Sequence, residues 1–151
     1  MRLLARVLAA LAAAACIVSL DACAGPTTTS EDYNRKAAAT AKAAASEVAT
    51  ASVGADLGVR ARATASYLDV TLSDAEDGLA SVQETFSSRQ PPTPADDKTR
   101  DQLGDLLNAA LNAVSSARIA ARRGDVAALR ATEPALEKSA KDLQRFQREL
   151  S

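Results

Sequence analysis

The densest group of side chains that could do acid–base or metal chemistry is the acidic trio Asp74, Glu76 and Asp77. Carboxylate oxygens are the ligands that Mg²⁺ and Ca²⁺ prefer, and paired carboxylates can act as general acid and base. The trio lies beside the apolar seam of a predicted helix, where charged side chains are typical of a solvated face. We expect such a face, and a divalent-cation site is the alternative.

The chain contains no histidine, which removes the commonest general base and metal ligand. The Glu-x-x-His pairs of di-iron bundles therefore cannot form. Once Met1 is removed, only Tyr33 and Tyr67 remain as conceivable axial ligands of a haem. The sequence also lacks a G-x-S-x-G motif, a P-loop and a dinucleotide-binding fingerprint. We predict no catalytic residue, no cofactor and no metal site, and hence no enzyme.

An N-terminal export signal is predicted over residues 1–22. Arg2 and Arg6 give a positive start, and an uncharged apolar run follows from Val7 to Leu20. This order of charged, apolar and small residues is typical of a secretion signal. The run would span only about 21 Å as a helix, too little for a hydrocarbon core of roughly 30 Å. We expect the mature chain to be exported, with membrane contact made through an anchor.

Cys23 is the residue to which a lipid anchor would be attached. The stretch Leu20-Asp21-Ala22-Cys23 resembles a bacterial lipobox, whose cysteine takes a diacylglyceryl group, although Asp21 departs from the usual small or apolar residue. Alternatively, Ala22-Cys23-Ala24 is an A-x-A site with cleavage before Gly25, and the protein is simply secreted. An unpaired cysteine in an exported chain needs an explanation, and a lipid attachment site provides one. We therefore predict lipidation of Cys23. Residues 23–30 are then a polar tether.

Residues 31–151 are rich in alanine and in long straight side chains, which favour helix. The first predicted helix runs from about Glu31 to Ser52 with Ser30 as N-cap, and Gly54 and Gly58 are expected to loosen the chain after it. Its inward stripe, spaced by three and four residues, consists of Tyr33, Ala37, Ala41, Ala44, Val48 and Ala51.

The second predicted helix has the strongest pattern, a 4-3-4-3-4 spacing of apolar residues that places them on one seam. These residues are Leu68, Leu72, Ala75, Leu79, Val82 and Phe86. The helix is expected to end before Pro91-Pro92, because residues that precede proline avoid the α region.

The third predicted helix begins at Thr93-Pro94, with Thr93 as N-cap and Asp96 at N3, where it can interact with the cap residue. Its stripe contains Leu103, Leu106, Leu107, Ala110, Leu111, Val114, Ala117 and Ala121. Gly124 should end it, and Asp125 should cap the fourth helix at once. The fourth stripe contains Leu129, Leu136, Ala140, Leu143, Phe146 or Gln147, and Leu150. Glu133-Pro134 should kink this helix or separate a short first turn.

Four helices with short joints predict an all-α fold, an up-down antiparallel four-helix bundle that follows the export signal. The start of the first helix and the ends of the second and fourth would then lie at the tether end. Tyr33, Phe86 and Phe146 should meet there with Leu103 nearby. We expect this group to be core packing, with a small apolar pocket as the alternative.

A candidate partner-binding surface is predicted at the opposite end of the bundle, away from the acidic residues near the tether. It consists of Arg60, Arg62, Arg118, Arg122 and Arg123. An acidic envelope protein or an anionic cell-wall polymer could dock there, although cations are also ordinary at helix C-termini. The formal net charge of the whole chain is −1, so no basic excess supports nucleic-acid binding.

Three stretches carry a resemblance to a known group of proteins: Glu31-Asp32-Tyr33 before an alanine-rich helix, residues 66–92, and RIAARRGD at residues 118–125. They are similar to uncharacterised exported proteins of high-GC Gram-positive bacteria, which are often predicted lipoproteins. The resemblance implies an envelope location and brings no activity with it. We therefore expect a lipid-anchored binding or scaffolding module on the outer face of the cytoplasmic membrane. The alternative is a secreted bundle that senses a small ligand or a cation.

Overall fold

The computed structural model describes residues 29–151, all of whose regular structure is helical. The elements are α2 (Ser30–Val59), α3 (Ala65–Ser87), the 3₁₀ turn η2 (Pro94–Asp96), α4 (Asp97–Arg122), α5 (Val126–Ala131) and α6 (Glu133–Glu149). The described part contains no strand, so the all-α prediction is confirmed. The predicted signal peptide, Cys23 and most of the tether lie outside the described residues.

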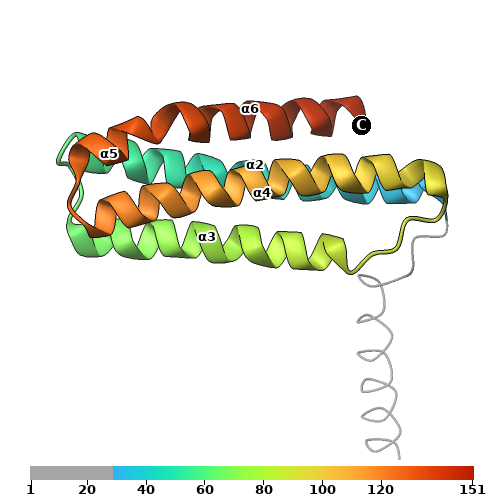
Figure 1. Ribbon diagram of the computed structural model, residues 1–151, viewed down its shortest axis with the longest axis horizontal. Helices are drawn as coiled ribbons and strands as arrows, with labels where there is room; N and C mark the ends of the chain where they lie inside the picture. Colours follow the sequence, from blue (N-terminus) through green and yellow to red (C-terminus); the bar gives the residue numbers. More distant parts are fainter. Residues whose placement is uncertain (1–28) are drawn as a thin grey trace, which may run out of the picture.

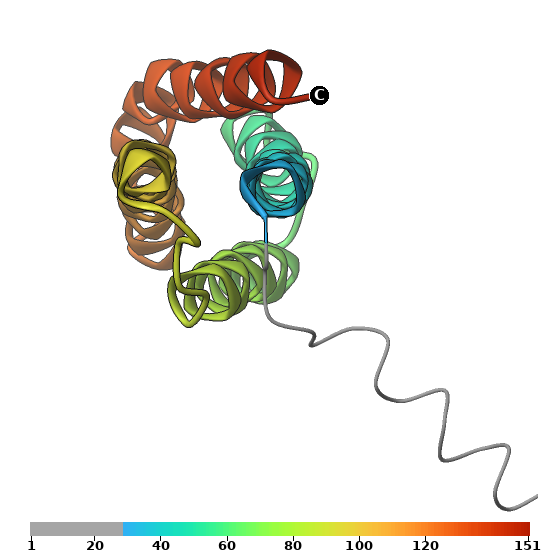
Figure 2. The same ribbon diagram turned by 90° about the vertical axis from the view of Figure 1, so that its right-hand side faces the viewer.

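The long helices α2, α3, α4 and α6 lie side by side around one apolar core (Figure 1). Viewed along their length, α3 and α6 occupy opposite sides of the group, and α2 and α4 occupy the other two (Figure 2). Helix α2 contacts α4 across the centre as well as its neighbours α3 and α6. Both α2 and α4 bury mainly alanines, whose small side chains permit this approach.

Different segments of the chain lie at the two ends of the molecule (Figure 1). We call the first the tether end; it holds the start of α2, the segment from the end of α3 to the start of α4, and the end of α6. The second, the distal end, holds the α2–α3 turn, the end of α4 and helix α5. The predicted arginines Arg60 and Arg62 lie in or beside that turn, and Arg118, Arg122 and Arg123 lie at the end of α4.

Helix α2 differs from the prediction at both ends. Its N-cap is Thr29, whose hydroxyl accepts a hydrogen bond from the Asp32 N–H at 3.2 Å, and Ser30 is already helical. Its C-terminal end is Val59, so the helix runs through Gly54 and Gly58. A Cβ at Gly58 would lie 2.8 Å from Leu129 Cδ2 and 2.9 Å from Leu68 Cδ1. The glycine therefore permits close packing, and the expectation of a loosened chain is wrong.

Most residues of the predicted inward stripes are buried, and the exceptions on the third and fourth stripes, which are partly buried, are Leu106, Leu111, Ala140 and Leu150. All six stripe residues of α2 are fully buried, and the α3 seam is buried except for the half-buried Val82. The sequence left open whether Phe146 or Gln147 belongs to the stripe of α6. Phe146 faces the core and Gln147 lies at its edge, so Phe146 is the stripe residue. Each fully buried leucine or aromatic side chain on these stripes contributes about 1.5–3 kcal/mol through removal from water.

Two turns at the distal end have the same backbone conformation. Ala61 and Gly124 each follow a helix C-cap and have positive φ angles of 54° and 64°. In each turn the next residue donates its N–H back into the helix, Arg62 to the Leu57 carbonyl and Asp125 to the Ala120 carbonyl. This is the Schellman arrangement. Gly124 was expected in this role, whereas Ala61 was not.

The helix boundaries near Pro94 and Pro134 follow the predictions. The Asp125 carboxylate caps α5 by accepting from the Ala128 N–H at 2.9 Å. Helix α5 ends at Ala131 and α6 starts at Glu133, so the proline separates a short helix from a long one. Thr93 precedes η2 and bonds to Asp96, after which α4 starts at Asp97.

Candidate functional site

The distal end brings the five predicted arginines together, but three of them have intramolecular partners. Arg60 Nε lies 2.8 Å from Asp56 Oδ1, one turn earlier on α2. Arg118 Nε bonds to Glu76 Oε2 and joins α4 to α3. Arg122 Nε lies 3.4 Å from Asp69 Oδ1, also across the α3–α4 groove. These contacts give part of the arginine group a structural role.

The Arg118–Glu76 pair is the more enclosed of the two interhelical contacts. Both side chains are only about one-fifth exposed, at 22% and 23%, whereas those of Arg122 and Asp69 are 60% and 50% exposed. The hydrogen bond to Glu76 raises the pKa of Arg118, so the guanidinium stays charged. Arg118 therefore fixes the register of α4 on α3 and presents little surface to a partner.

Arg62 and Arg123 are exposed, and within residues 29–151 neither has a carboxylate in ion-pair range. Arg130, in the last turn of α5, is exposed at the same end and was missed by the sequence analysis. The predicted break at Glu133-Pro134 could have revealed it, because Arg130 belongs to the short segment between Gly124 and that break. The positive charges free to meet a partner at the distal end are thus those of Arg62, Arg123 and Arg130. Arg122 has only its exposed contact with Asp69.

The acidic trio is divided by the fold. Glu76 turns toward α4 and binds Arg118, whereas Asp74 and Asp77 point to solvent. Within the described part of the chain, no three His, Cys, Asp or Glu residues are grouped closely enough to hold a metal ion. The geometry there is that of a solvated helix face with one interhelical ion pair.

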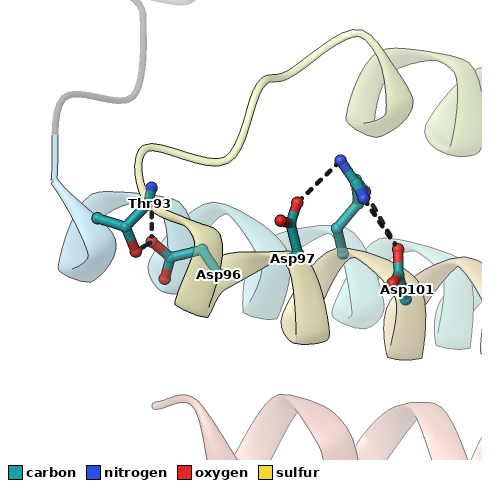
Figure 3. Close-up of polar contacts among 5 residues, drawn as sticks. Thr93, Asp96, Asp97 and Asp101 are labelled. Carbon is teal, nitrogen blue, oxygen red and sulfur yellow. Dashed lines mark hydrogen bonds and ion pairs between the residues drawn. The ribbon is translucent and has the colours of Figure 1, made fainter.

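Asp96 forms a buried polar junction at the tether end (Figure 3). Its Oδ2 accepts from the Thr93 hydroxyl at 2.7 Å, the Thr93 N–H at 3.2 Å and the Ser30 hydroxyl at 2.7 Å. These bonds, the one from the Thr93 side chain first, lower the pKa of Asp96. The first residue of α2 is thereby attached to the start of η2, 66 residues later.

Two further acidic residues near the tether, Asp32 and Asp97, are paired with basic side chains. Asp32 pairs with Arg35 and with Lys36, and hydrogen bonding to Lys36 lowers the pKa of Asp32. Arg100 lies between Asp97 (3.1 Å) and Asp101 (3.2 Å), as Figure 3 shows. The contrast between an acidic and a basic end is therefore weaker in charge than the sequence alone indicates.

The predicted aromatic group at the tether end is buried. The rings of Tyr33 and Phe86 have centroids 5.5 Å apart and a 43° interplanar angle, and both side chains are at most 2% exposed. Phe146 and Leu103 belong to the same core. Burial raises the pKa of Tyr33, whose hydroxyl has no hydrogen-bond partner among residues 29–151. These rings fill the core, which favours packing over an apolar pocket among them.

A shallow apolar groove of about 430 Å³ lies between α2 and α6, outside the core. Its lining residues are Ala49, Ser52, Val53, Glu133, Leu136, Glu137 and Ala140. Two carboxylates border an otherwise apolar floor, so the groove suits a small cationic amphiphile better than an anion. It is open to solvent and offers limited enclosure to any ligand.

No protein family, curated protein or solved structure was found to match this chain. Within residues 29–151, no helix has both the length and the apolar character that crossing a bilayer would require.

Proposed function

We propose that the protein is a lipid-anchored binding or scaffolding module of the cell envelope, without catalytic activity. In this proposal, residues 1–22 direct export, Cys23 carries the lipid, and residues 31–151 form an up-down antiparallel four-helix bundle. The protein resides on the outer face of the cytoplasmic membrane. Its distal end binds an acidic envelope protein or an anionic cell-wall polymer.

The observation that carries this proposal is the separation of the chain's start from its unpaired arginines. The described chain starts at the tether end, whereas Arg62, Arg123 and Arg130 lie at the distal end. A helix of 30 residues such as α2 is about 45 Å long. A lipid at Cys23 would therefore hold these arginines well away from the bilayer, where they could reach an anionic partner.

A matched pair of charge reversals tests the proposal. Arg122→Glu with Arg123→Glu removes exposed distal charge and spares Arg118, whose loss would break the tie to Glu76. Lys42→Glu with Arg148→Glu makes the same change in net charge at exposed positions away from the distal end. Full-length proteins would be incubated with isolated cell walls, before and after chemical removal of the phosphate-bearing polymers.

We expect the parent and the Lys42/Arg148 variant to sediment with intact walls, and binding to fall as salt rises. The Arg122/Arg123 variant should remain in the supernatant while its circular dichroism stays helical. Equal wall binding by both variants would contradict the proposed role of the distal end. Binding that is lost from stripped walls would identify the polymer, and binding that persists would identify an envelope protein.

The alternative function, a secreted small-ligand or cation sensor, is favoured by one observation, the α2–α6 groove with Glu133 and Glu137. Native mass spectrometry of protein taken from its own culture would test it. A bound molecule lost on Val53→Glu, an exposed position in the groove, but retained in the Arg122/Arg123 variant would support the sensor. The apo mass alone would count against it.

A further inference from the structure

A shallow groove of about 300 Å³ lies between α2 and α3, toward the tether end. Its lining residues are Lys36, Ala39, Thr40, Ala43, Ser81, Val82, Thr85 and Arg89. They supply two cations, three hydroxyls and a floor of small apolar side chains, and none of them carries a carboxylate. Because the α2–α6 groove is instead bordered by Glu133 and Glu137, the two grooves suit ligands of opposite charge.

The antiparallel register of α2 on α3 orders the polar groups along this groove. The Glu47 carboxylate lies against Gly78, where both of its oxygens would be 3.0 Å from an added Cβ. Eleven residues from each of these two, toward the tether, Lys36 and Arg89 both line the groove. The hydroxyls lie between these two levels, which are about 17 Å apart along the helices. The groove is therefore cationic at its tether end, lined by hydroxyls in the middle and bordered by a carboxylate beyond its distal end.

The tether end of the groove has an excess of positive charge. Arg89 forms no side-chain hydrogen bond or ion pair within residues 29–151. Lys36 lies 3.1 Å from Asp32, but Asp32 also pairs with Arg35, so one carboxylate is shared between two cations. A phosphate group placed between Lys36 and Arg89 would accept charge-assisted hydrogen bonds from both, and a guanidinium can donate two in parallel.

The hydroxyls of Thr40, Ser81 and Thr85 are open to a ligand, because none of them forms a hydrogen bond within the described part of the chain. Other hydroxyls on α2 behave differently, since Ser46 and Thr50 each donate to the backbone carbonyl one turn earlier. Such bonding back to the helix is ordinary for serine and threonine. The groove hydroxyls are left to bind the oxygens of a phosphate or the hydroxyls of a polar headgroup.

The cationic end of the groove also lies where a lipid anchor would place a membrane. With a lipid at Cys23, the chain from there to Thr29 would span at most about 22 Å. Lys36 lies seven residues further along, which adds about 10 Å. A bundle that tilts on this short tether would bring the side formed by α2 and α3 against the phospholipid headgroups. Anionic lipids attract cations placed at that distance.

We propose that the α2–α3 groove binds the headgroup of an anionic phospholipid. The phosphate lies between Lys36 and Arg89, and the uncharged part of the headgroup contacts the hydroxyls of Thr40 and Thr85. Glu47 repels a second anion on the distal side, so the headgroup has one orientation. Such binding rests on the proposed function, because the lipid anchor brings the groove to the bilayer, and it is independent of the partner at the distal end.

Cysteine labelling tests whether a headgroup occupies the groove. Protein isolated from the cell envelope would be returned to vesicles of phosphatidylcholine alone, or of phosphatidylcholine with about one-quarter phosphatidylglycerol. Ala43→Cys, an exposed position in the groove, should react with a water-soluble maleimide severalfold more slowly on the phosphatidylglycerol vesicles. Ser116→Cys, exposed on α4, is the matched control and should react equally on both. The unsubstituted chain controls for Cys16 and Cys23. Equal rates for Ala43→Cys on the two kinds of vesicle would overturn the site.

Further substitutions in the same chain separate a defined site from general attraction to a charged surface. Arg89→Glu should abolish the protection, and Thr40→Val with Thr85→Val should weaken it without any change in charge. Arg148→Glu repeats the charge change at an exposed position of the tether end outside the groove, and Thr50→Val removes a hydroxyl outside it. Both controls should keep the protection, and circular dichroism checks that each variant is helical. Equal loss of protection in Arg89→Glu and Arg148→Glu would overturn the site.

Flotation of the unsubstituted protein with the two kinds of vesicle distinguishes the groove from the anchor. Flotation with both, together with equal labelling in the groove, would overturn the groove and leave the anchor. Flotation with the phosphatidylglycerol vesicles alone would contradict the anchor but support the groove, and flotation with neither would contradict both. Free glycerol phosphate added to phosphatidylcholine vesicles tests the source of the phosphate. Protection by it, without protection on phosphatidylglycerol vesicles, would overturn the lipid as ligand.

Discussion

Ala61 and Gly124 hold the same left-handed backbone conformation, one residue beyond the C-caps of α2 and α4, with φ angles of 54° and 64°. The conformation strains any residue with a Cβ and suits glycine. No neighbouring atom lies within 4 Å of a Cβ built on Gly124, so the backbone alone determines the effect of a substitution there.

Ala61→Gly should stabilise the protein by about 1 kcal/mol, because glycine relieves the strain at that turn. Gly124→Ala should destabilise it by about 1 kcal/mol for the opposite reason. Urea unfolding followed by circular dichroism measures both changes. Two shifts of the same sign would show that the two turns are not equivalent.

Leu79→Ala should lower the free energy of unfolding by about 2–5 kcal/mol, because it leaves a cavity in the centre of the α3 seam. Leu79 is fully buried. Val70→Ala on the exposed side of the same helix is the control and should have little effect on the unfolding midpoint. A small loss at Leu79 would mean that the α3 seam repacks readily.

Ala44→Leu should destabilise the protein by about 1–3 kcal/mol, since the added atoms must push α2 away from its neighbours. Ala44 is fully buried. Ala43→Leu makes the same change at the adjacent exposed position and is expected to be close to neutral. Thermal unfolding of the two variants under identical conditions makes the comparison. A neutral Ala44→Leu would show that α2 is loosely attached.

Asp96→Asn should destabilise the protein most at neutral pH and progressively less in acid. Hydrogen bonds from Thr93 and Ser30 hold the pKa of Asp96 below its usual value. The stabilisation is therefore fully present above the unfolded pKa of about 3.9 and is lost as the pH falls through the lower folded value.

Urea midpoints of the parent and of Asp96→Asn, measured between neutral pH and the acid limit, test this dependence. Asp105→Asn, which removes an exposed carboxylate from the adjacent helix α4, is the control. We expect the two curves for the parent and Asp96→Asn to converge in acid. Parallel curves would show that the carboxylate charge has no part in the junction.

Lipidation of Cys23 predicts a mature protein that starts at this residue, carries acyl mass and partitions into detergent. Two or three acyl chains would anchor it firmly, whereas one would not. The Cys23→Ala variant, which has no lipid, should no longer partition into the detergent phase. Intact-mass measurement of protein from the cell envelope and the medium distinguishes the outcomes, and a chain in the medium that begins at Gly25 would show simple secretion.

The helical stripes could be predicted from spacing alone because burial in a helix repeats every three or four residues. The same rule could not place Gly54 and Gly58 inside α2, because the close packing there involves residues from other helices. Thr71 and Leu72 lie against Gly54, and Leu68 and Leu129 lie against Gly58. Ser30 likewise looked like a cap, yet its hydroxyl bonds to Asp96, far away in sequence.

The arginine group shows the same division between local and tertiary information. The Arg60–Asp56 pair follows from a four-residue spacing on one helix. The partners of Arg118 and Arg122 depend on how α4 lies against α3, which no spacing within either helix reveals.

The position of α2 in the core has a consequence for the order in which the protein folds. Helix α2 is the first described helix to be synthesised, and its contact with α6, the last, is its most extensive. The loop that this contact closes spans most of the domain, so its entropy must be overcome late. Until residues 133–149 are available, the alanine stripe of α2 has no α6 to cover it. Folding of the domain therefore follows synthesis of α6, and loss of that helix should prevent it.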